Sequence, residues 1–327
     1  MSSVERATGR RVGERSGNRP LPPVRSGRPL VSRKYVEVVL LLAPALALYL
    51  LFVMFPVVQA AHFSVYKWNG LEPLTNFVGL ENYRKAFHDP IFLKAIGHNA
   101  FFIVASLLIQ LPLGLSLAFL LNRKMVGRSA LRMIVFAPYV LSEVTTGVVW
   151  QLLLMPDTLV DSVLKDLGLG GLIQPWLSDL DTVRYTLFVV ITWKYIGFAV
   201  ILFLAGLQGI PAELHEAARI DGATGWQLTR HITLPLMGPT IRIWIFLSII
   251  GSLQLFDIIW VMTLGGPANS SNTMVTYLYD RGFRRTQFGY GSAASVILFV
   301  VSFVFALIYQ RFVMRRDTEG ALTRRVG

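Results

Sequence analysis

Long, nearly uncharged apolar segments constrain this chain more than any other feature. A helix of about 20 residues crosses a bilayer, because each residue adds about 1.5 Å and the hydrocarbon core is about 30 Å thick. Six segments are long enough: Val36–Val58, Asn99–Leu121, Met133–Leu154, Tyr185–Leu207, Ile243–Leu264 and Ala293–Val313. Their hydrophobicity is continuous rather than alternating, which is typical of helices and not of barrel strands. We therefore predict an all-α membrane protein with six transmembrane helices.

The composition excludes several classes of site. Only 15% of the residues are charged, where a soluble domain has about 25%. The chain contains no cysteine, which excludes disulfides, thiolate catalysis and cysteine–metal sites. The five histidines show no metal-ligand spacing, so we expect no metal site. Neither a nucleophile motif nor a pair of catalytic acids is evident, so we do not expect an enzyme.

The basic residues predict the orientation. Of the 31 Lys and Arg residues, 21 lie in the two termini and in the loops after the second and fourth segments, and nine lie in the other loops. Because positive residues stay inside, we expect both termini to be cytoplasmic in the plasma or inner membrane. The net charge of +12 then reflects topology and contact with the lipid bilayer, and we expect no nucleic acid partner. Residues 1–35 are predicted to be a disordered basic tail, 36–313 the membrane domain and 314–327 a second cytoplasmic tail.

The predicted cytoplasmic loop 208–238 carries a spaced motif. It reads Glu-Ala-Ala-x-x-x-Gly, then nine residues, then Ile-x-Leu-Pro, from Glu216 to Pro235. An acidic residue near a helix start suits the helix dipole, and Gly222 can end a helix. The alanines leave a thin face that another protein could approach closely. On residue types alone, an amphipathic loop helix lying on the membrane is the alternative.

The spacing of this loop resembles the cytoplasmic coupling loop, the "EAA" loop, of ABC importer permeases. Four other segments are similar to sugar permeases of the maltose-type ABC importer group: Phe77–Phe87, Asn122–Arg132, Phe256–Pro267 and Phe288–Ala294. The resemblance covers roughly residues 35–315 and is nearer to the short first permease subunit of that group. It implies the type I ABC importer permease fold, and it favours a docking function for the loop.

The resemblance also implies partners and a function. A permease of this group moves a mono- or oligosaccharide inward together with a second homologous permease, two ATP-binding-cassette ATPase subunits and an extracytoplasmic sugar-binding protein. The chain lacks the Gly-x-x-x-x-Gly-Lys-Ser/Thr phosphate loop, so we expect ATP to be used by the partner ATPase and no cofactor to be bound here. The residues expected to contact the ATPase are Glu216, Ala217, Ala218, Asp221, Gly222, Ile232, Leu234 and Pro235.

Two alternatives to sugar import are considered. Related permeases carry glycerol 3-phosphate, so that solute or another polar solute is one alternative. The second is an ion-coupled secondary transporter, which would need acidic residues inside the membrane and often shows inverted repeats. Asp257 and Glu143 fit the first requirement, but no repeat is evident.

Polar and aromatic residues within the segments are candidates for a substrate pathway. A lysine at the depth of Lys194 costs about 3 kcal/mol, so it is expected either to face a cavity or partner, or to extend its ammonium toward the membrane surface. Aromatic rings could stack on sugar faces, or anchor a helix at the interface. The predicted pathway residues are Lys194, Trp193, Tyr195, Ser252, Gln254 and Asp257.

Overall fold

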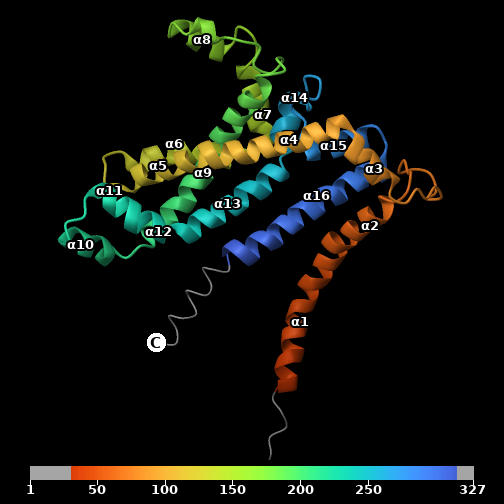
Figure 1. The fold of residues 1–327 in the computed structure, drawn as a ribbon, viewed down its shortest axis with the longest axis horizontal. Helices are drawn as coiled ribbons and strands as arrows, with labels where there is room; N and C mark the ends of the chain where they lie inside the picture. The colour runs from red at the N-terminus through yellow and green to blue at the C-terminus, as the bar shows by residue number, and fades with distance from the viewer. Residues whose placement is uncertain (1–30, 315–327) are drawn as a thin grey trace, which may run out of the picture. The chain divides into compact units, whose positions relative to one another are not determined.

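The structure is a computed structural model that describes residues 31–314. These residues form helices joined by loops (Figure 1). Residues 1–30 and 315–327, which include most of the predicted disordered basic tail and of the predicted second cytoplasmic tail, lie outside the described residues. The single β pairing in the described part is an isolated bridge between Tyr66 and Phe77. The chain divides into two units, Met1–Met54 and Phe55–Gly327, which are described separately.

The first unit holds α1 (Val31–Tyr49), followed by a π-helical turn at Leu50–Met54. From Val38 to Val53 the side chains are apolar and exposed, as Leu41 at 80% and Phe52 at 69% illustrate. A helix that is apolar on every side suits lipid or the surface of another membrane helix.

The second unit contains the remaining helices. They are α2 (Phe55–Phe63), α3 (Glu81–His88), α4 (Pro90–Ala105), α5 (Leu111–Asn122), α6 (Arg128–Val140), α7 (Glu143–Leu153), α8 (Leu159–Asp166), α9 (Val183–Gln208), α10 (Ala212–Ile220), α11 (Gly225–Leu228), α12 (Leu234–Leu236), α13 (Gly238–Leu253), α14 (Asp257–Thr263), α15 (Met274–Tyr279) and α16 (Phe288–Tyr309). A short 3-10 turn lies at Gly170–Leu172, and π-helical turns lie at Ser106–Gln110, Thr229–Thr233, Asp280–Arg284 and Gln310–Met314.

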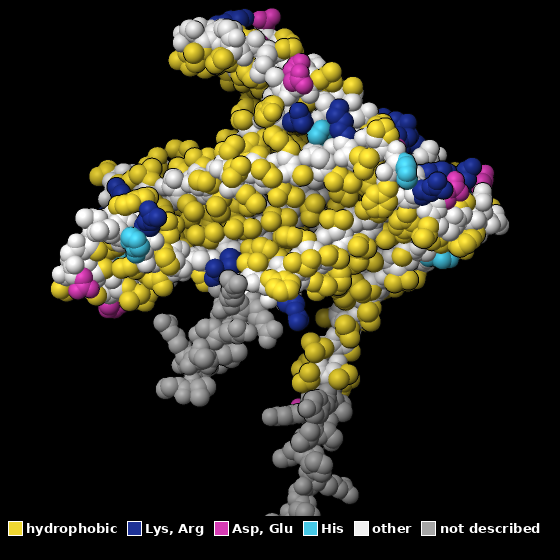
Figure 2. Space-filling model, viewed as in Figure 1, with side chains coloured by type: hydrophobic (Ala, Val, Ile, Leu, Met, Phe, Trp, Pro, Cys, Tyr) yellow, Lys and Arg dark blue, Asp and Glu magenta, His cyan; other side chains and the backbone are white. Residues whose placement is uncertain are grey.

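Four stretches of the described chain are long and apolar enough to cross a membrane: Glu37–Phe63, Pro90–Asn122, Val183–Gln208 and Phe288–Met314. Two bent pairs raise the number to six if each is one span: α6 with α7, and the helix Gly225–Leu236 with α13. Figure 2 shows apolar side chains over the middle of the helices and charged side chains gathered toward their ends. This distribution agrees with the predicted all-α membrane protein.

The third predicted segment is not one straight helix. α6 and α7 meet at an angle of 100°, with Leu141 and Ser142 in extended conformation between them. Ser142 is the N-cap of α7, because its side chain accepts a hydrogen bond from the amide of Thr145 at 3.1 Å. Pro138 in the last turn of α6 has no amide hydrogen to continue the helix ladder. The hydropathy of the sequence did not indicate this break, because the residues on both sides of it are apolar.

The fifth predicted segment, Ile243–Leu264, is also interrupted. α13 ends at Leu253, and α14 begins as a separate short helix at Asp257 that packs against α7. Ile258 and Ile259 of α14 are completely buried. The apolar residues after Leu253 therefore serve packing between α14 and α7 rather than a longer span.

α9 lies at the centre of the second unit and packs against α5, α6 and α13. Phe203 and Val200 on α9 are completely buried in the hydrophobic cluster that these helices form. Gly197 allows α6 to approach closely, because a Cβ atom there would lie 2.6 Å from the carbonyl oxygen of Val135. A second cluster, which includes Phe92 and Tyr277, joins α3, α4, α15 and α16. α9 therefore fixes the positions of the helices that enclose the cavity described next.

Candidate functional site

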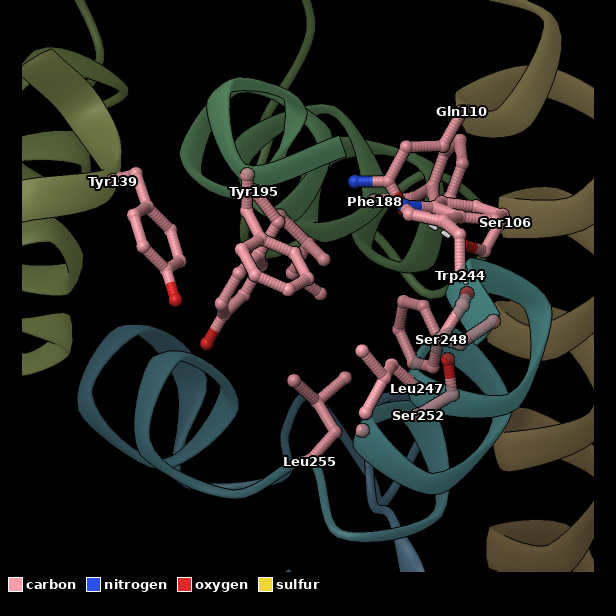
Figure 3. Close-up of a pocket in the computed structure, with 14 residues that line it drawn as sticks. Ser106, Gln110, Tyr139, Phe188, Tyr195, Trp244, Leu247, Ser248, Ser252 and Leu255 are labelled. Carbon is pink, nitrogen blue, oxygen red and sulfur yellow. Dashed lines mark hydrogen bonds between the residues drawn. The ribbon is translucent and has the colours of Figure 1, made fainter. Parts of the chain in front are cut away.

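A cavity of about 210 Å³ is enclosed by α4, by the π-helical turn Ser106–Gln110 that follows α4, and by α6, α9 and α13 (Figure 3). Its lining is aromatic and aliphatic, interrupted by a few hydroxyl and amide groups. The fourteen lining residues are Phe102, Ser106, Gln110, Tyr139, Phe188, Ile191, Tyr195, Phe198, Trp244, Leu247, Ser248, Gly251, Ser252 and Leu255. None of them is charged, so the cavity wall that this chain contributes is neutral.

The polar groups of the cavity form a connected chain between two helices. The Ser106 hydroxyl donates to the Gln110 Oε1 atom at 2.6 Å, and its oxygen lies 2.7 Å from that of Ser248. Gln110 is only 5% exposed, and its Nε2 atom has no hydrogen-bond partner within the described part of the chain. Figure 3 shows that amide nitrogen pointing into the space enclosed by the labelled residues. A buried amide left without a partner is costly, so this donor favours a polar group bound beside it, although the nitrogen itself is covered by neighbouring atoms.

Aromatic rings form another part of the wall. Tyr139 and Tyr195 meet edge to face with ring centres 6.4 Å apart, and Tyr139 stacks on Phe198 at 5.3 Å. Trp244 is 3% exposed and also lines the cavity. Flat apolar rings beside neutral hydrogen-bonding groups can hold a solute that has both C–H faces and hydroxyls.

Two of the six predicted pathway residues line this cavity: Tyr195 and Ser252. The other four do not. Trp193 is 37% exposed and meets Trp150 edge to face, with ring centres 5.4 Å apart. Gln254 follows the last turn of α13, and Asp257 opens α14. Sequence position alone could not separate the residues that line the cavity from those that do not, because neighbouring residues of a helix point in different directions.

Lys194 has a role that neither expectation described. It is 2% exposed, and its ammonium donates to the carbonyl oxygens of Pro138 at 3.1 Å, Tyr139 at 3.0 Å, and Leu141. These carbonyls lie at the end of α6, where the helix dipole favours a positive charge, and that of Pro138 also accepts the amide of Leu141 at 3.3 Å. Lys194 therefore caps α6 at its break, and it does not line the cavity.

Sequence reasoning missed Ser106, Gln110 and Tyr139. A detectable signal existed for the first two, because Ser106 and Gln110 are four residues apart in an apolar run and so share one helix face. Tyr139 gave no such signal, since its position depends on the break after Val140. Among residues 31–314, no group of three or more His, Asp or Glu side chains is placed to hold a metal ion.

The loop with the Glu-Ala-Ala motif folds as two short helical segments joined by a turn. α10 ends in a Schellman motif: the amide of Ala223 donates to the carbonyl of Ala218 at 2.9 Å, and that of Gly222 to Arg219 at 3.0 Å. Gly222 has a φ of +82°, a conformation that L-residues rarely adopt, and no atom lies within 4 Å of the place where its Cβ would be. Gly222 is thus required by the backbone, while the space around it is open.

The second half of the loop is fixed by local contacts. Thr224 and Gln227 form a capping box at the start of α11, and the His215 ring lies 3.2 Å from the Thr233 hydroxyl. The remaining residues predicted to bind an ATPase divide by exposure. Glu216, Ala217, Asp221 and Pro235 are exposed, Ile232 and Leu234 are half-buried, and Ala218 is buried.

Two large apolar side chains extend from the same loop. Ile220 is 86% exposed and Trp226 is 68% exposed. Aromatic and aliphatic residues exposed beside an acidic helix form a surface suited to protein contact.

The chain is similar to known membrane transport proteins. Residues 110–318 match the family described as "binding-protein-dependent transport system inner membrane component". A probable ABC transporter permease protein of Pyrococcus horikoshii is 39% identical over 274 residues, which cover 83% of this chain and 94% of that protein. The diacetylchitobiose uptake system permease protein NgcF of Streptomyces coelicolor is 35% identical over 326 residues, covering 94% of this chain and 92% of its own length.

The fold also matches a solved structure. A crystal structure of a bacterial ABC transporter involved in the import of the acidic polysaccharide alginate superposes with a TM-score of 0.76 at 26% identity, covering 87% of this chain and 97% of that chain. The all-helical arrangement expected from the sequence is therefore that of an ABC importer permease.

Proposed function

Since the chain belongs to the family of binding-protein-dependent transport system inner membrane components, we propose that it is a permease subunit that moves carbohydrate inward in an ATP-binding-cassette importer. The cavity carries the carbohydrate part of this proposal. Its neutral wall combines aromatic rings with hydroxyls and an unpartnered amide, and sugars present the matching C–H faces and hydroxyls. The named substrates of the relative and of the solved transporter, diacetylchitobiose and alginate, are also glycans.

A phosphate ester such as glycerol 3-phosphate fits the cavity less well. A phosphate group favours arginine or lysine donors, and none of the lining residues of this chain is charged. Lys194, the buried cation nearest in sequence to a lining residue, is occupied by three backbone carbonyls. We therefore favour a carbohydrate without a phosphate group over a phosphate ester.

Transport requires partners that supply energy and substrate. The α10–α12 loop offers the acidic and apolar surface described above, and we assign it to docking of an ATPase subunit on the cytoplasmic side. Two such ATPase subunits, a second permease and an extracytoplasmic sugar-binding protein complete the importer in this proposal. ATP is then bound by the ATPase, and this chain holds no cofactor of its own.

The orientation follows from the charge asymmetry, with both termini and the coupling loop in the cytoplasm. Reporter fusions test it directly. Fusions at Gly127 and Gly225 should report cytoplasm, and a fusion at Gly170 should report the outside. An outside report at Gly225 would rule out ATPase docking through this loop.

The function itself is tested by reconstituting the four kinds of subunit in proteoliposomes. The importer is oriented with its ATPase subunits in the vesicle lumen, where the ATP is enclosed. Uptake of labelled diacetylchitobiose, lactose and alginate oligosaccharide into that lumen is then measured. We expect uptake of at least one glycan to require ATP and the binding protein, and to persist when ionophores remove ion gradients. Uptake that is abolished by ionophores but independent of ATP would instead support the secondary-transporter alternative, for which Glu143 and Asp257 are the acidic candidates.

A further inference from the structure

Two consecutive residues of α9 hold the two sides of the break between α6 and α7. The Lys194 ammonium binds the carbonyls at the end of α6, as described above. The Tyr195 hydroxyl donates to the Oε1 atom of Glu143, the first residue of α7. The break is thus connected through Tyr195 to the wall of the cavity.

Contacts on both sides of Glu143 hold its backbone in place. It follows Ser142, which caps α7 by accepting the Thr145 amide at 3.1 Å. The break before it is held by Lys194, and α7 packs along α14. The carboxyl group of Asp257, at the start of α14, also lies in contact with that of Glu143. Glu143 is only partly exposed, and its carboxylate can therefore act as a fixed acceptor for Tyr195.

The Tyr195 ring has a second set of neighbours inside the cavity. It meets Tyr139 edge to face, and it lines the same space as Gln110. A tyrosine ring can swing about its side-chain bonds unless its hydroxyl is held, and an aromatic surface for sugar stacking must stay at one angle to be effective. The ring angle therefore depends on the acceptor at its far end.

We propose that Glu143 is a positioning residue for substrate binding, which fixes the Tyr195 ring in the cavity wall through a hydrogen bond. The carboxylate oxygen, and not the negative charge, is what Tyr195 needs. This inference rests on the proposed function only for the identity of the bound solute, since the orientation of the ring is a property of this chain.

The first experiment measures the ring without any substrate. This chain alone is labelled with 3-fluorotyrosine and assembled with unlabelled partner subunits, and the ¹⁹F signal of Tyr195 among its 11 tyrosines is identified by its loss in Tyr195→Phe. Glu143→Ala should shift and narrow this signal, because the ring gains freedom. Glu143→Gln should leave it near the wild-type position, because the amide oxygen still accepts the hydrogen bond.

The second experiment measures uptake in the proteoliposomes with labelled diacetylchitobiose, lactose and alginate oligosaccharide. Glu143→Ala and Tyr195→Phe should each raise KM by roughly three- to tenfold, the scale of one lost hydrogen bond, with little change in kcat. The double variant should be no worse than either single variant, since both remove the same interaction. Glu143→Gln should restore a KM close to that of the wild type.

The outcomes separate the two proposals. If the wild-type importer takes up none of the glycans, the proposed function fails, and the fluorine signal still decides whether Glu143 positions Tyr195. If the wild type transports and Glu143→Ala leaves both KM and the Tyr195 signal unchanged, the positioning inference is wrong. Loss of uptake in Glu143→Gln as in Glu143→Ala would also overturn it, because the charge would then be the required feature.

Discussion

The ammonium nitrogen of Lys194 lies 3.0 Å from the carbonyl oxygen of Tyr139, and this contact joins the middle of α9 to the end of α6. Because Lys194 also binds the carbonyls of Pro138 and Leu141, one side chain donates to three backbone carbonyls at the break. In a membrane, such carbonyls have no water to bind, so an internal donor is needed. Lys194 is thus a condition for breaking the third span where it breaks.

Replacing Lys194 by methionine should therefore lower stability before it alters substrate affinity. We expect a loss of about 2–3 kcal/mol, the range for a hydrogen bond to a charged group, seen as a lower Tm in detergent or nanodiscs. Lys165→Met is the matched control, since its ion pair with Asp157 at 2.8 Å is exposed and should matter little. A wild-type Tm combined with a changed KM would return Lys194 to a pathway role.

The unpartnered amide of Gln110 should contribute to substrate binding. In Gln110→Met the side chain keeps its length but loses the unpartnered donor at the cavity wall, so KM for glycan uptake should rise roughly tenfold, with normal ATPase assembly. Ser116→Ala is the control, because Ser116 is exposed and bonds only the Pro112 carbonyl among the contacts described. Unchanged uptake kinetics in Gln110→Met would place the bound sugar elsewhere.

A buried network at the predicted outer end should respond to loss of one hydroxyl. Tyr277 is 1% exposed, and its hydroxyl donates to Asp89 at 2.6 Å and lies 2.8 Å from that of Tyr290. Tyr277→Phe should destabilise the protein by about 1–3 kcal/mol, measured as a fall in Tm. Tyr185→Phe, at a residue that is 57% exposed, should have little effect. Equal Tm values for the two variants would show that the network adds no stability.

The same hydroxyl should affect stability at high pH. Burial, and then the hydrogen bond to Asp89, raise the pKa of Tyr277 well above its usual value. The folded state keeps the proton while the unfolded tyrosine loses it near its usual pKa of about 10. The stabilisation of the folded state that comes from the protonated Tyr277 hydroxyl is thus complete below that pH and declines as the pH rises further. The Tm of Tyr277→Phe should fall less steeply than that of the wild type above about pH 10, and parallel curves would contradict this assignment.

The sequence predicted the helical class and the approximate location of four spans because both depend on long apolar runs. It also predicted that Gly222 ends or turns a helix, which its backbone confirms. It could not predict the breaks at Leu141 and after Leu253, since apolar residues continue across both. Without those breaks, neither the capping role of Lys194 nor the position of Tyr139 in the cavity could be derived.

The coupling loop gives the prediction with the clearest backbone requirement. Gly222 has a φ of +82° with open space around it, so a side chain there costs backbone energy of about 1–2 kcal/mol and causes no clash within this chain. Gly222→Val should insert in the membrane normally, because it lies outside the spans, but should distort the Schellman turn between α10 and α11. We expect less ATPase to co-purify with it, and less ATP-dependent uptake. Gly222→Asn should retain more of both, because asparagine tolerates this conformation best among residues with a Cβ.

Two further variants make this test specific. Gly225→Ala is the matched control, since Gly225 also has open space around it but has no positive φ, and it should behave as wild type. Glu216→Lys leaves the turn intact and reverses an exposed charge on α10, so it should weaken ATPase binding without changing Tm. If Gly222→Val and Glu216→Lys both keep wild-type ATPase binding and uptake, this loop does not couple ATP hydrolysis to transport.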